Sequence, residues 1–141
     1  MSPGNIHRTA DCAPARDVLS RVGDSWSMLI IILLGDGPQR FNELRRTIDG
    51  ISQRMLSLTL KNLERDGFVL RTVTPTVPPR VDYSLTELGF SVWHPVKQLG
   101  QWAISHHSEI EASRQSFDAR RAASMPEAAA PQRGHRSGSH S

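Results

Sequence analysis

The sequence has little of several features that define common protein classes. It contains one cysteine, Cys12, and its longest uninterrupted apolar run, Met28 to Leu34, is far shorter than the roughly 20 residues that cross a membrane. A single cysteine excludes an intramolecular disulfide, and the segment Met1 to Asp11 has no hydrophobic stretch typical of a secretory signal. We therefore expect a cytoplasmic protein with no membrane partner.

Sequence motifs of common enzymes are missing as well. There is no glycine-rich phosphate loop, no G-x-S-x-G and no H-E-x-x-H. His107 and Glu111, four residues apart, offer two metal ligands, but no third ligand is evident near them in the sequence. The sequence thus predicts a protein that is not an enzyme and that holds no metal ion or cofactor.

Positive charge is concentrated in one part of the chain. The net charge is +3, yet the segment from Arg40 to Arg80 has eight basic and four acidic residues, which gives +4 there. Seven of the eight basic residues are arginines, whose planar donor groups match phosphates and guanine edges. The segment suggests a polyanionic partner, and an ordinary solvated face with ion pairs is the alternative explanation.

The composition along the chain predicts one domain between two tails. Residues 1–11 contain Pro3 and Gly4 and no apolar pattern, so we expect a flexible segment. Residues 119–141 mix alanine, serine, glycine, proline and charges without periodicity, which is typical of a disordered tail. The domain is therefore predicted at residues 12–118, and no internal repeat is visible in it.

Helical patterns fill the first half of this domain. Pro14 suits the first turn of a helix that Gly23 ends. Residues 28–34 fit either a buried strand or a buried helix, and we favour the helix. The apolar positions between Phe41 and Ile48 recur at i, i+3 and i+7, which predicts a third helix.

The helix that begins after Ser52 has the clearest boundaries. Ser52 is a good N-cap, the preceding Ile51 can pack on Leu56, and Gly67 ends the helix. At 100° per residue one face is mostly apolar and comprises Met55, Leu56, Thr59, Leu60 and Leu63. The opposite face comprises Gln53, Arg54, Ser57, Lys61, Glu64 and Arg65. Leu58 falls on this polar face, either as an ordinary exposed leucine or as an apolar contact for a group such as a thymine methyl.

A hairpin is predicted next. Residues 68–74 and 81–85 alternate between the two faces of a strand, and the prolines of the TPTVPPR segment between them cannot donate to a β-ladder. The tip should therefore project as a semi-rigid loop with Arg80 near its base.

The last helix combines a capping signal with a heptad pattern. Ser84 or Thr86 can cap it, and Ser84 with Glu87 fits a capping box. Residues then recur at alternating spacings of four and three, as in a coiled coil, at Val92, Val96, Leu99, Ala103, His106, Ile110, Ser113 and Phe117. Such a seam on a small domain predicts packing on a second subunit, and packing within one chain is the alternative.

Three stretches carry a family resemblance: DVLSRVGDSWSMLIIILLGDGPQRFNELRR, GISQRMLSLTLKNLERDGFVLR and VPPRVDYSLTELG. They closely resemble the HxlR-type family of bacterial transcription regulators, over about residues 12–110. The resemblance implies an α+β winged helix-turn-helix with additional N- and C-terminal dimerisation helices. It also implies a homodimer that binds a pseudo-palindromic operator in double-stranded DNA and represses or activates a promoter. The seam residues Val92, Val96, Leu99, Ala103, His106 and Ile110 would then lie in the dimer interface.

The resemblance also gives a set of expected DNA contacts, namely Arg40, Phe41, Asn42, Arg45, Ser52, Gln53, Arg54, Ser57, Lys61 and Arg80. Gln53 could read adenine and Arg54 guanine in the major groove, whereas Lys61 is better placed for a phosphate. Arg80 in the wing could reach the backbone or a narrow minor groove. A surface ion pair is the alternative for each arginine.

Cys12 supports a second hypothesis. In several members of the family a cysteine directly before the proline of the first helix senses oxidants or electrophiles, but here Ala13 separates Cys12 from Pro14. The helix dipole and Arg16 favour the thiolate, whereas Asp11 opposes it. Cys12 is thus either a redox or electrophile sensor, with a small-molecule or electrophile effector, or an incidental small residue. In a different class, the basic face would dock an acidic protein in place of DNA.

Overall fold

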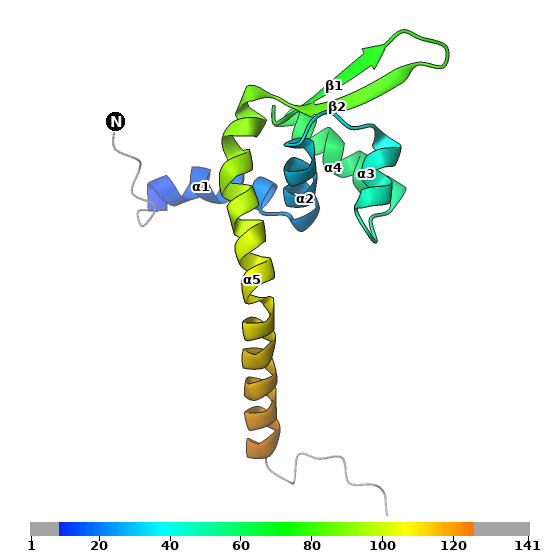
Figure 1. The fold of residues 1–141 in the computed structure, drawn as a ribbon. Coiled ribbons are helices and arrows are strands. Elements are labelled where there is room, and N and C mark those ends of the chain that lie inside the picture. The colour runs from blue at the N-terminus through cyan, green and yellow to red at the C-terminus, as the bar shows by residue number, and fades with distance from the viewer. Residues whose placement is uncertain (1–8, 126–141) are drawn as a thin grey trace, which may run out of the picture. The chain divides into compact units, whose positions relative to one another are not determined.

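The computed structural model describes residues 9–125, which divide into two compact units after Gln101. Figure 1 shows the order of the elements, which are α1 (Thr9–Val22), α2 (Ser25–Leu34), α3 (Phe41–Thr47), α4 (Gln53–Arg65), β1 (Val69–Thr74), β2 (Arg80–Leu85) and α5 (Glu87–Ser124). The predicted order of helices followed by a hairpin is confirmed. None of these helices is both long and apolar enough to span a bilayer.

Residues 28–34 form most of α2, so the helix that we favoured over a strand is confirmed. The Asp24 carboxylate accepts a hydrogen bond from the Ser27 backbone N–H at 3.2 Å and caps the helix, which starts it before the apolar run. Ile30, Ile31 and Leu34 are completely buried. Residues 28–34 are all apolar, even where the side chain is partly exposed as at Leu29, which explains why periodicity alone did not distinguish a helix from a strand.

The predicted boundaries of α4 are also confirmed. The Ser52 hydroxyl oxygen accepts a hydrogen bond from the Met55 backbone N–H at 3.0 Å. Gly67 follows the helix with φ of +85°, a left-handed conformation that favours glycine. Leu56, Thr59, Leu60 and Leu63 are buried, as expected, whereas Met55 at the edge of this face is exposed.

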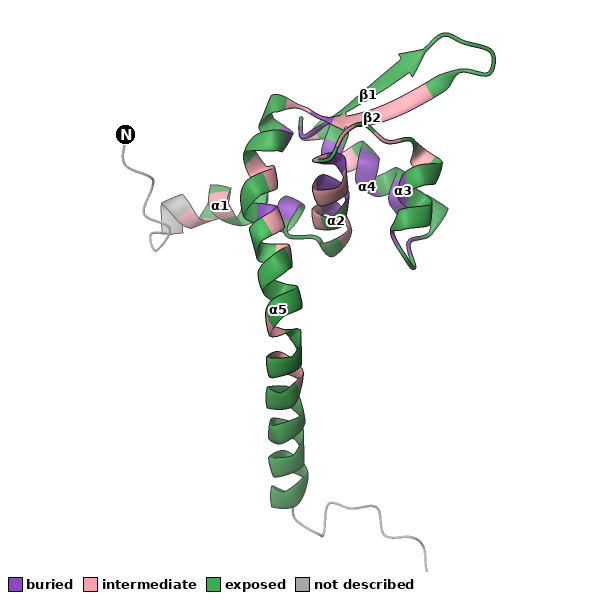
Figure 2. Cartoon of the chain, in the orientation of Figure 1, coloured by how far each residue is buried: buried purple, intermediate pink, exposed green. Residues whose placement is uncertain are grey.

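The hydrophobic core of the first unit lies where α2, α3 and α4 meet, and Figure 2 shows their buried residues in purple. Leu44 of α3 and Val96 of α5 are buried in the same cluster. Trp93 of α5 packs against the end of α2, because its indole Nε1–H donates to the Ile32 carbonyl at 3.3 Å. These contacts fix the start of α5 on the core.

The hairpin is antiparallel, with Val69 opposite Leu85 and Thr74 opposite Arg80. Residues 71–80 are all exposed, and the tip projects away from α2, α3 and α4 (Figure 1). Gln39 and Tyr83 exchange backbone hydrogen bonds of 2.9 and 2.8 Å, so the segment before α3 is tied to β2. This bridge holds α3 beside the base of the hairpin.

The predicted start of α1 was wrong, and the structure decides between the two caps that we considered for α5. Helix α1 begins at Thr9, so Pro14 lies inside it, beyond the first turn, and Thr9–Asp11 are helical although we predicted a flexible segment. Thr86, and not Ser84, caps α5: its hydroxyl accepts a hydrogen bond from the Gly89 backbone N–H at 3.0 Å. Ser84 pairs with Leu70 in the hairpin and is therefore unable to start a helix.

The last helix also extends further than the prediction. Helix α5 continues to Ser124, beyond the predicted boundary at residue 118, so the predicted disordered tail contains helix in its first residues. The rest of that tail, residues 126–141, and residues 1–8 of the predicted flexible segment lie outside the described residues.

Candidate nucleic-acid interface

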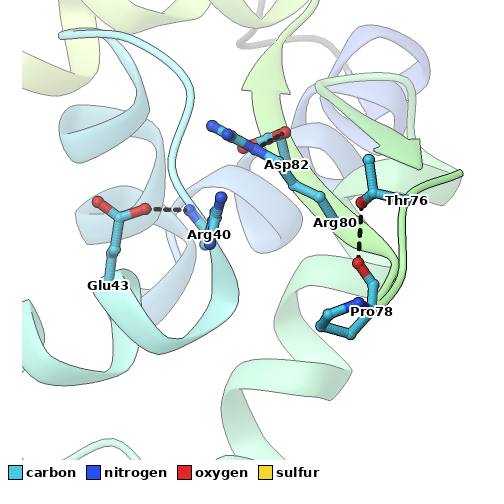
Figure 3. Close-up of polar contacts among 6 residues, drawn as sticks. All are labelled: Arg40, Glu43, Thr76, Pro78, Arg80 and Asp82. Carbon is cyan, nitrogen blue, oxygen red and sulfur yellow. Dashed lines mark hydrogen bonds and ion pairs between the residues drawn. The ribbon is translucent and has the colours of Figure 1, made fainter. Parts of the chain in front are cut away.

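Helix α3 is positioned by one buried side chain and one capping contact. Leu44 is completely buried, which turns the rest of this short helix outward. The Glu43 carboxylate accepts a hydrogen bond from the Arg40 backbone N–H at 2.9 Å, as Figure 3 shows. The Arg40 side chain is exposed at the start of α3.

Helix α4 presents the predicted polar face to solvent. The turn before it passes through Gly50, whose φ of +83° is in the left-handed region. Burial of Leu56, Leu60 and Leu63 directs the opposite face of α4 outward. Consequently the predicted contact residues of this segment are all exposed, and they are Ser52, Gln53, Arg54, Ser57 and Lys61.

The wing is held by two local contacts, both visible in Figure 3. Arg80 forms an ion pair with Asp82, with 3.0 Å between Nε and Oδ2. The Thr76 hydroxyl donates to the Pro78 carbonyl at 2.8 Å, which orders the tip. The ion pair is the alternative that we raised for each arginine, and for Arg80 it is present. About half of the Arg80 side chain nevertheless remains accessible.

A groove of about 690 Å³ lies between the start of α3 and the base of the wing. It is lined by Arg40, Phe41, Asn42, Glu43, Arg46, Pro79, Arg80 and Val81. The structure thus brings together four predicted residues, namely Arg40, Phe41, Asn42 and Arg80. The predicted residues of α4 lie outside this groove, on a helix that α3 contacts.

Arg46 also lines the groove, although it was absent from the predicted set. Its only signal in the sequence was its place in the basic segment, because no motif distinguishes it from neighbouring arginines. The bridge between Gln39 and Tyr83, which brings α3 to the wing, is a tertiary contact that the sequence pattern did not predict.

Positive charge on this face is mostly not neutralised. Within residues 9–125 the ion pairs are Arg21 with Asp66, Arg80 with Asp82 and Arg114 with Glu111. The other basic residues of the predicted set take part in none of these pairs, and they are Arg40, Arg45, Arg54 and Lys61. Exposed, unpaired cations on α3 and α4 make a surface suited to a polyanion.

The remaining predicted positions lie on α1 and α5. Cys12 is partly buried in the first turn of α1. In the first unit Val96 is buried in the chain's own core, whereas Leu99 is 53% exposed. In the second unit Ala103 is exposed, and His106 and Ile110 are half-buried. The His106 ring stacks on Trp102, with 4.6 Å between ring centroids.

The described part of the chain contains no cluster of three or more His, Cys, Asp or Glu side chains suited to a metal ion. His107 and Glu111 therefore remain without a third ligand within these residues.

Helices α2, α3 and α4, followed by a two-stranded wing and with an exposed basic face on α4, define a winged helix-turn-helix of the DNA-binding class. Within this class the chain belongs to the HxlR-like helix-turn-helix family, which it matches over residues 21–111. It is 42% identical over 114 residues to an HTH-type transcriptional regulator, YtfH, of Escherichia coli strain K12, covering 81% of this chain and 89% of YtfH. The protein is therefore a transcriptional regulator and not an enzyme.

Two solved structures support the same assignment. A putative transcriptional regulator, ytfH, from Salmonella typhimurium superimposes with a TM-score of 0.68 and 43% identity, over 72% of this chain and 91% of that one. The redox regulator HypR in its reduced form superimposes with a TM-score of 0.66 and 41% identity, over 70% of this chain and 98% of HypR.

Proposed function

We propose that the protein acts as a homodimer that binds a pseudo-palindromic operator in a sequence-specific way. The observation that carries this proposal is the exposed, largely unpaired basic surface of α3, α4 and the wing base. The segment from Arg40 to Arg80, which contains these elements, carries a charge of +4, whereas the net charge of the whole chain is +3. Two copies of this surface would meet two half-sites separated by one or more helical turns of DNA.

The residues of this surface would make different contacts with DNA, depending on their positions. Gln53 and Arg54, in the first turn of α4, would enter the major groove and read base edges. Lys61, two turns further along, would contact a phosphate. Arg40 and Arg46 line the groove beside the wing and would hold a backbone phosphate there, together with the accessible part of Arg80.

Dimerisation is supported by apolar side chains that the single chain leaves exposed. Val18 and Leu19 of α1 are more than half exposed, and so is Leu99 of α5. Exposed apolar groups on helices outside the DNA-reading surface are typical of a subunit interface. The heptad spacing of α5 also includes Ala103, His106 and Ile110, which we assign to the same proposed interface.

The proposal is tested by selecting binding sites from a random-sequence duplex pool with the full-length protein. We expect enrichment of one inverted-repeat sequence, which then gives a discrete gel shift that survives excess nonspecific competitor. Recovery of unselected sequence, with shifts that competitor abolishes, would overturn sequence-specific binding. It would favour the docking of an acidic protein on the same basic surface.

A second candidate function is control of DNA binding by oxidation of Cys12. HypR, which is described as a redox regulator, has 41% identity to this chain, and its oxidised form has also been solved. Cys12 lies in the first turn of α1 and is partly buried. Between two subunits, diamide would accept two electrons and two protons from a pair of Cys12 thiols and leave one disulfide.

The test compares the wild type with Cys12→Ser on the selected operator, with diamide and with reductant. We expect diamide to change the affinity of the wild type for the operator and reductant to reverse that change. The affinity of Cys12→Ser should be the same under both conditions. An identical response of the two proteins would dispose of the redox hypothesis and leave DNA binding intact.

A further inference from the structure

One apolar side chain stands inside the basic face of α4. Leu58 lies four residues after Arg54 and three before Lys61, so the three side chains are neighbours along one side of the helix. Leu58 is 51% exposed. The Leu58 side chain also lines a hollow of about 280 Å³, together with Met55 and Asn62 of α4 and with residues of α1 and α2.

The core does not require this leucine. Leu56, Leu60 and Leu63 of the same helix are almost fully buried and already fill the contact between α4 and the rest of the first unit. Leu58 points away from that contact, where a polar residue would be equally compatible with the helix. The Leu58 side chain can therefore make an apolar contact with a ligand that binds this face of α4.

The proposed partner of helix α4 is the major groove of DNA, which offers few apolar groups. In the major groove the base edges present hydrogen-bond donors and acceptors, and the one apolar group among them is the 5-methyl of thymine. Arg54 and Lys61 can serve guanine edges and phosphates, but Leu58 can form no hydrogen bond through its side chain. A leucine between two cations thus matches a thymine methyl beside charged or polar partners.

We propose that Leu58 is a specificity-determining residue that selects thymine in each half-site through contact with its 5-methyl group. The inference rests on the proposed function, because it places α4 in the major groove. It adds a preference that hydrogen-bonding residues do not supply, since uracil and thymine present the same donors and acceptors to them.

The experiment removes only the methyl group. Each thymine of the selected operator is replaced in turn by deoxyuridine, and affinities are measured for the wild type, Leu58→Ala and Leu58→Met. For the wild type we expect one thymine per half-site at which uracil weakens binding about fourfold, which equals the roughly 0.8 kcal/mol of one buried methyl group. Leu58→Ala should bind both operators equally, and Leu58→Met, which keeps an apolar side chain, should retain a penalty.

Each outcome decides the proposal. Equal binding of thymine and uracil by the wild type, or a penalty that persists in Leu58→Ala, would make Leu58 an ordinary exposed leucine and overturn the inference while specific DNA binding stands. Failure to select any operator would instead overturn the proposed function, and this inference with it. Unchanged thermal unfolding of both variants, expected for an exposed position, separates these effects from misfolding.

Discussion

Among single residues, Arg54 is the most important for the proposed recognition of DNA bases. It is exposed in the first turn of α4, directly opposite the buried Leu56, Leu60 and Leu63 at 100° per residue. No ion pair within residues 9–125 engages it. A long cation in this position can reach bases or phosphates without first breaking a contact within its own chain.

We expect Arg54→Ala to weaken binding to the selected operator by about 1–3 kcal/mol, or roughly 5- to 150-fold, and to relax the preference at one base pair per half-site. The measurement is equilibrium binding to the operator and to variants with single base-pair changes. Arg114→Ala is the matched control, because Arg114 is also exposed but lies on α5 in an ion pair with Glu111. Equal losses for the two variants would refute a base contact by Arg54.

Element boundaries depend on single capping groups, and α4 is the clearest case. The Ser52 hydroxyl satisfies the Met55 backbone N–H, which has no partner within the helix. The cap also determines where the reading face of α4 begins, because Gln53 and Arg54 are the first two helical residues.

Replacement of Ser52 by alanine should lower the free energy of unfolding by about 1 kcal/mol, because the cap is lost. Ser52→Asn should stay within a few tenths of the wild type, since asparagine caps equally well. Urea denaturation of the three proteins provides the comparison. Equal stability of Ser52→Ala and wild type would mean that the observed hydrogen bond contributes nothing to the fold.

Helices α2 and α5 approach each other most closely at Gly35, the C-cap of α2. A Cβ added to Gly35 would lie 1.8 Å from the Trp93 Nε1 atom, although Gly35 has ordinary helical φ and ψ angles. The glycine is therefore required by packing and not by backbone conformation. The Trp93 indole donates a hydrogen bond to the Ile32 carbonyl, so the ring cannot move away from an added methyl group without loss of this bond.

Gly35→Ala should destabilise the fold by about 1–3 kcal/mol through overpacking. The same substitution in a Trp93→Ala background should cost much less, because the clashing ring is gone, and this coupling is measured by a double-mutant cycle. Asp36→Ala, at an exposed neighbouring position, is the control and should change stability little. Additive effects of the two substitutions would contradict the close contact.

The sequence predicts elements well where local chemistry is decisive. Ser52 and Gly67 bound α4 as expected, because a cap and a left-handed glycine act within a few residues. The sequence could not decide between Ser84 and Thr86 as the cap of α5: Ser84 fits a capping box with Glu87, but it pairs with Leu70 in the hairpin, so Thr86 caps the helix. Strand pairing is a long-range interaction, which a local pattern does not contain.

In the candidate site, too, the features set by local sequence were predictable and those set by tertiary contacts were not. The outward face of α4 was predictable from periodicity, since burial of Leu60 and its neighbours directs the rest. The place of Arg46 beside the wing was not, because it depends on the bridge between Gln39 and Tyr83, two residues 44 positions apart in the sequence. Tertiary contacts of this kind decide which arginines share a groove.

At the scale of the whole molecule, the surface proposed for DNA and the surface proposed for a second subunit lie on different elements. The basic residues proposed to contact DNA lie on α3, α4 and the wing, whereas the exposed apolar residues proposed for the subunit interface lie on α1 and α5. This separation allows one surface to meet DNA while the other meets a second subunit. Binding of an inverted repeat would then depend on the dimer, even though no residue of α5 is expected to touch DNA.

We expect Leu99→Glu to shift the protein from dimer to monomer and to weaken operator binding, because a charge would replace a 53% exposed leucine in the proposed interface. Gln98→Glu introduces the same charge at the adjacent exposed position, outside the heptad seam, and should leave both properties unchanged. Sedimentation equilibrium gives the mass and gel shifts give the affinity. A wild-type protein that sediments as a monomer while it binds the operator would overturn the dimer.

The central claim, that the basic face binds specific DNA, is tested most directly by affinity for the selected operator and for a scrambled duplex across a range of salt concentrations. We expect tight binding to the operator alone, with a log-log slope of about −5 to −9 for a dimer that neutralises six to ten phosphates. Equal affinity for both duplexes, or a flat dependence on salt, would contradict the account.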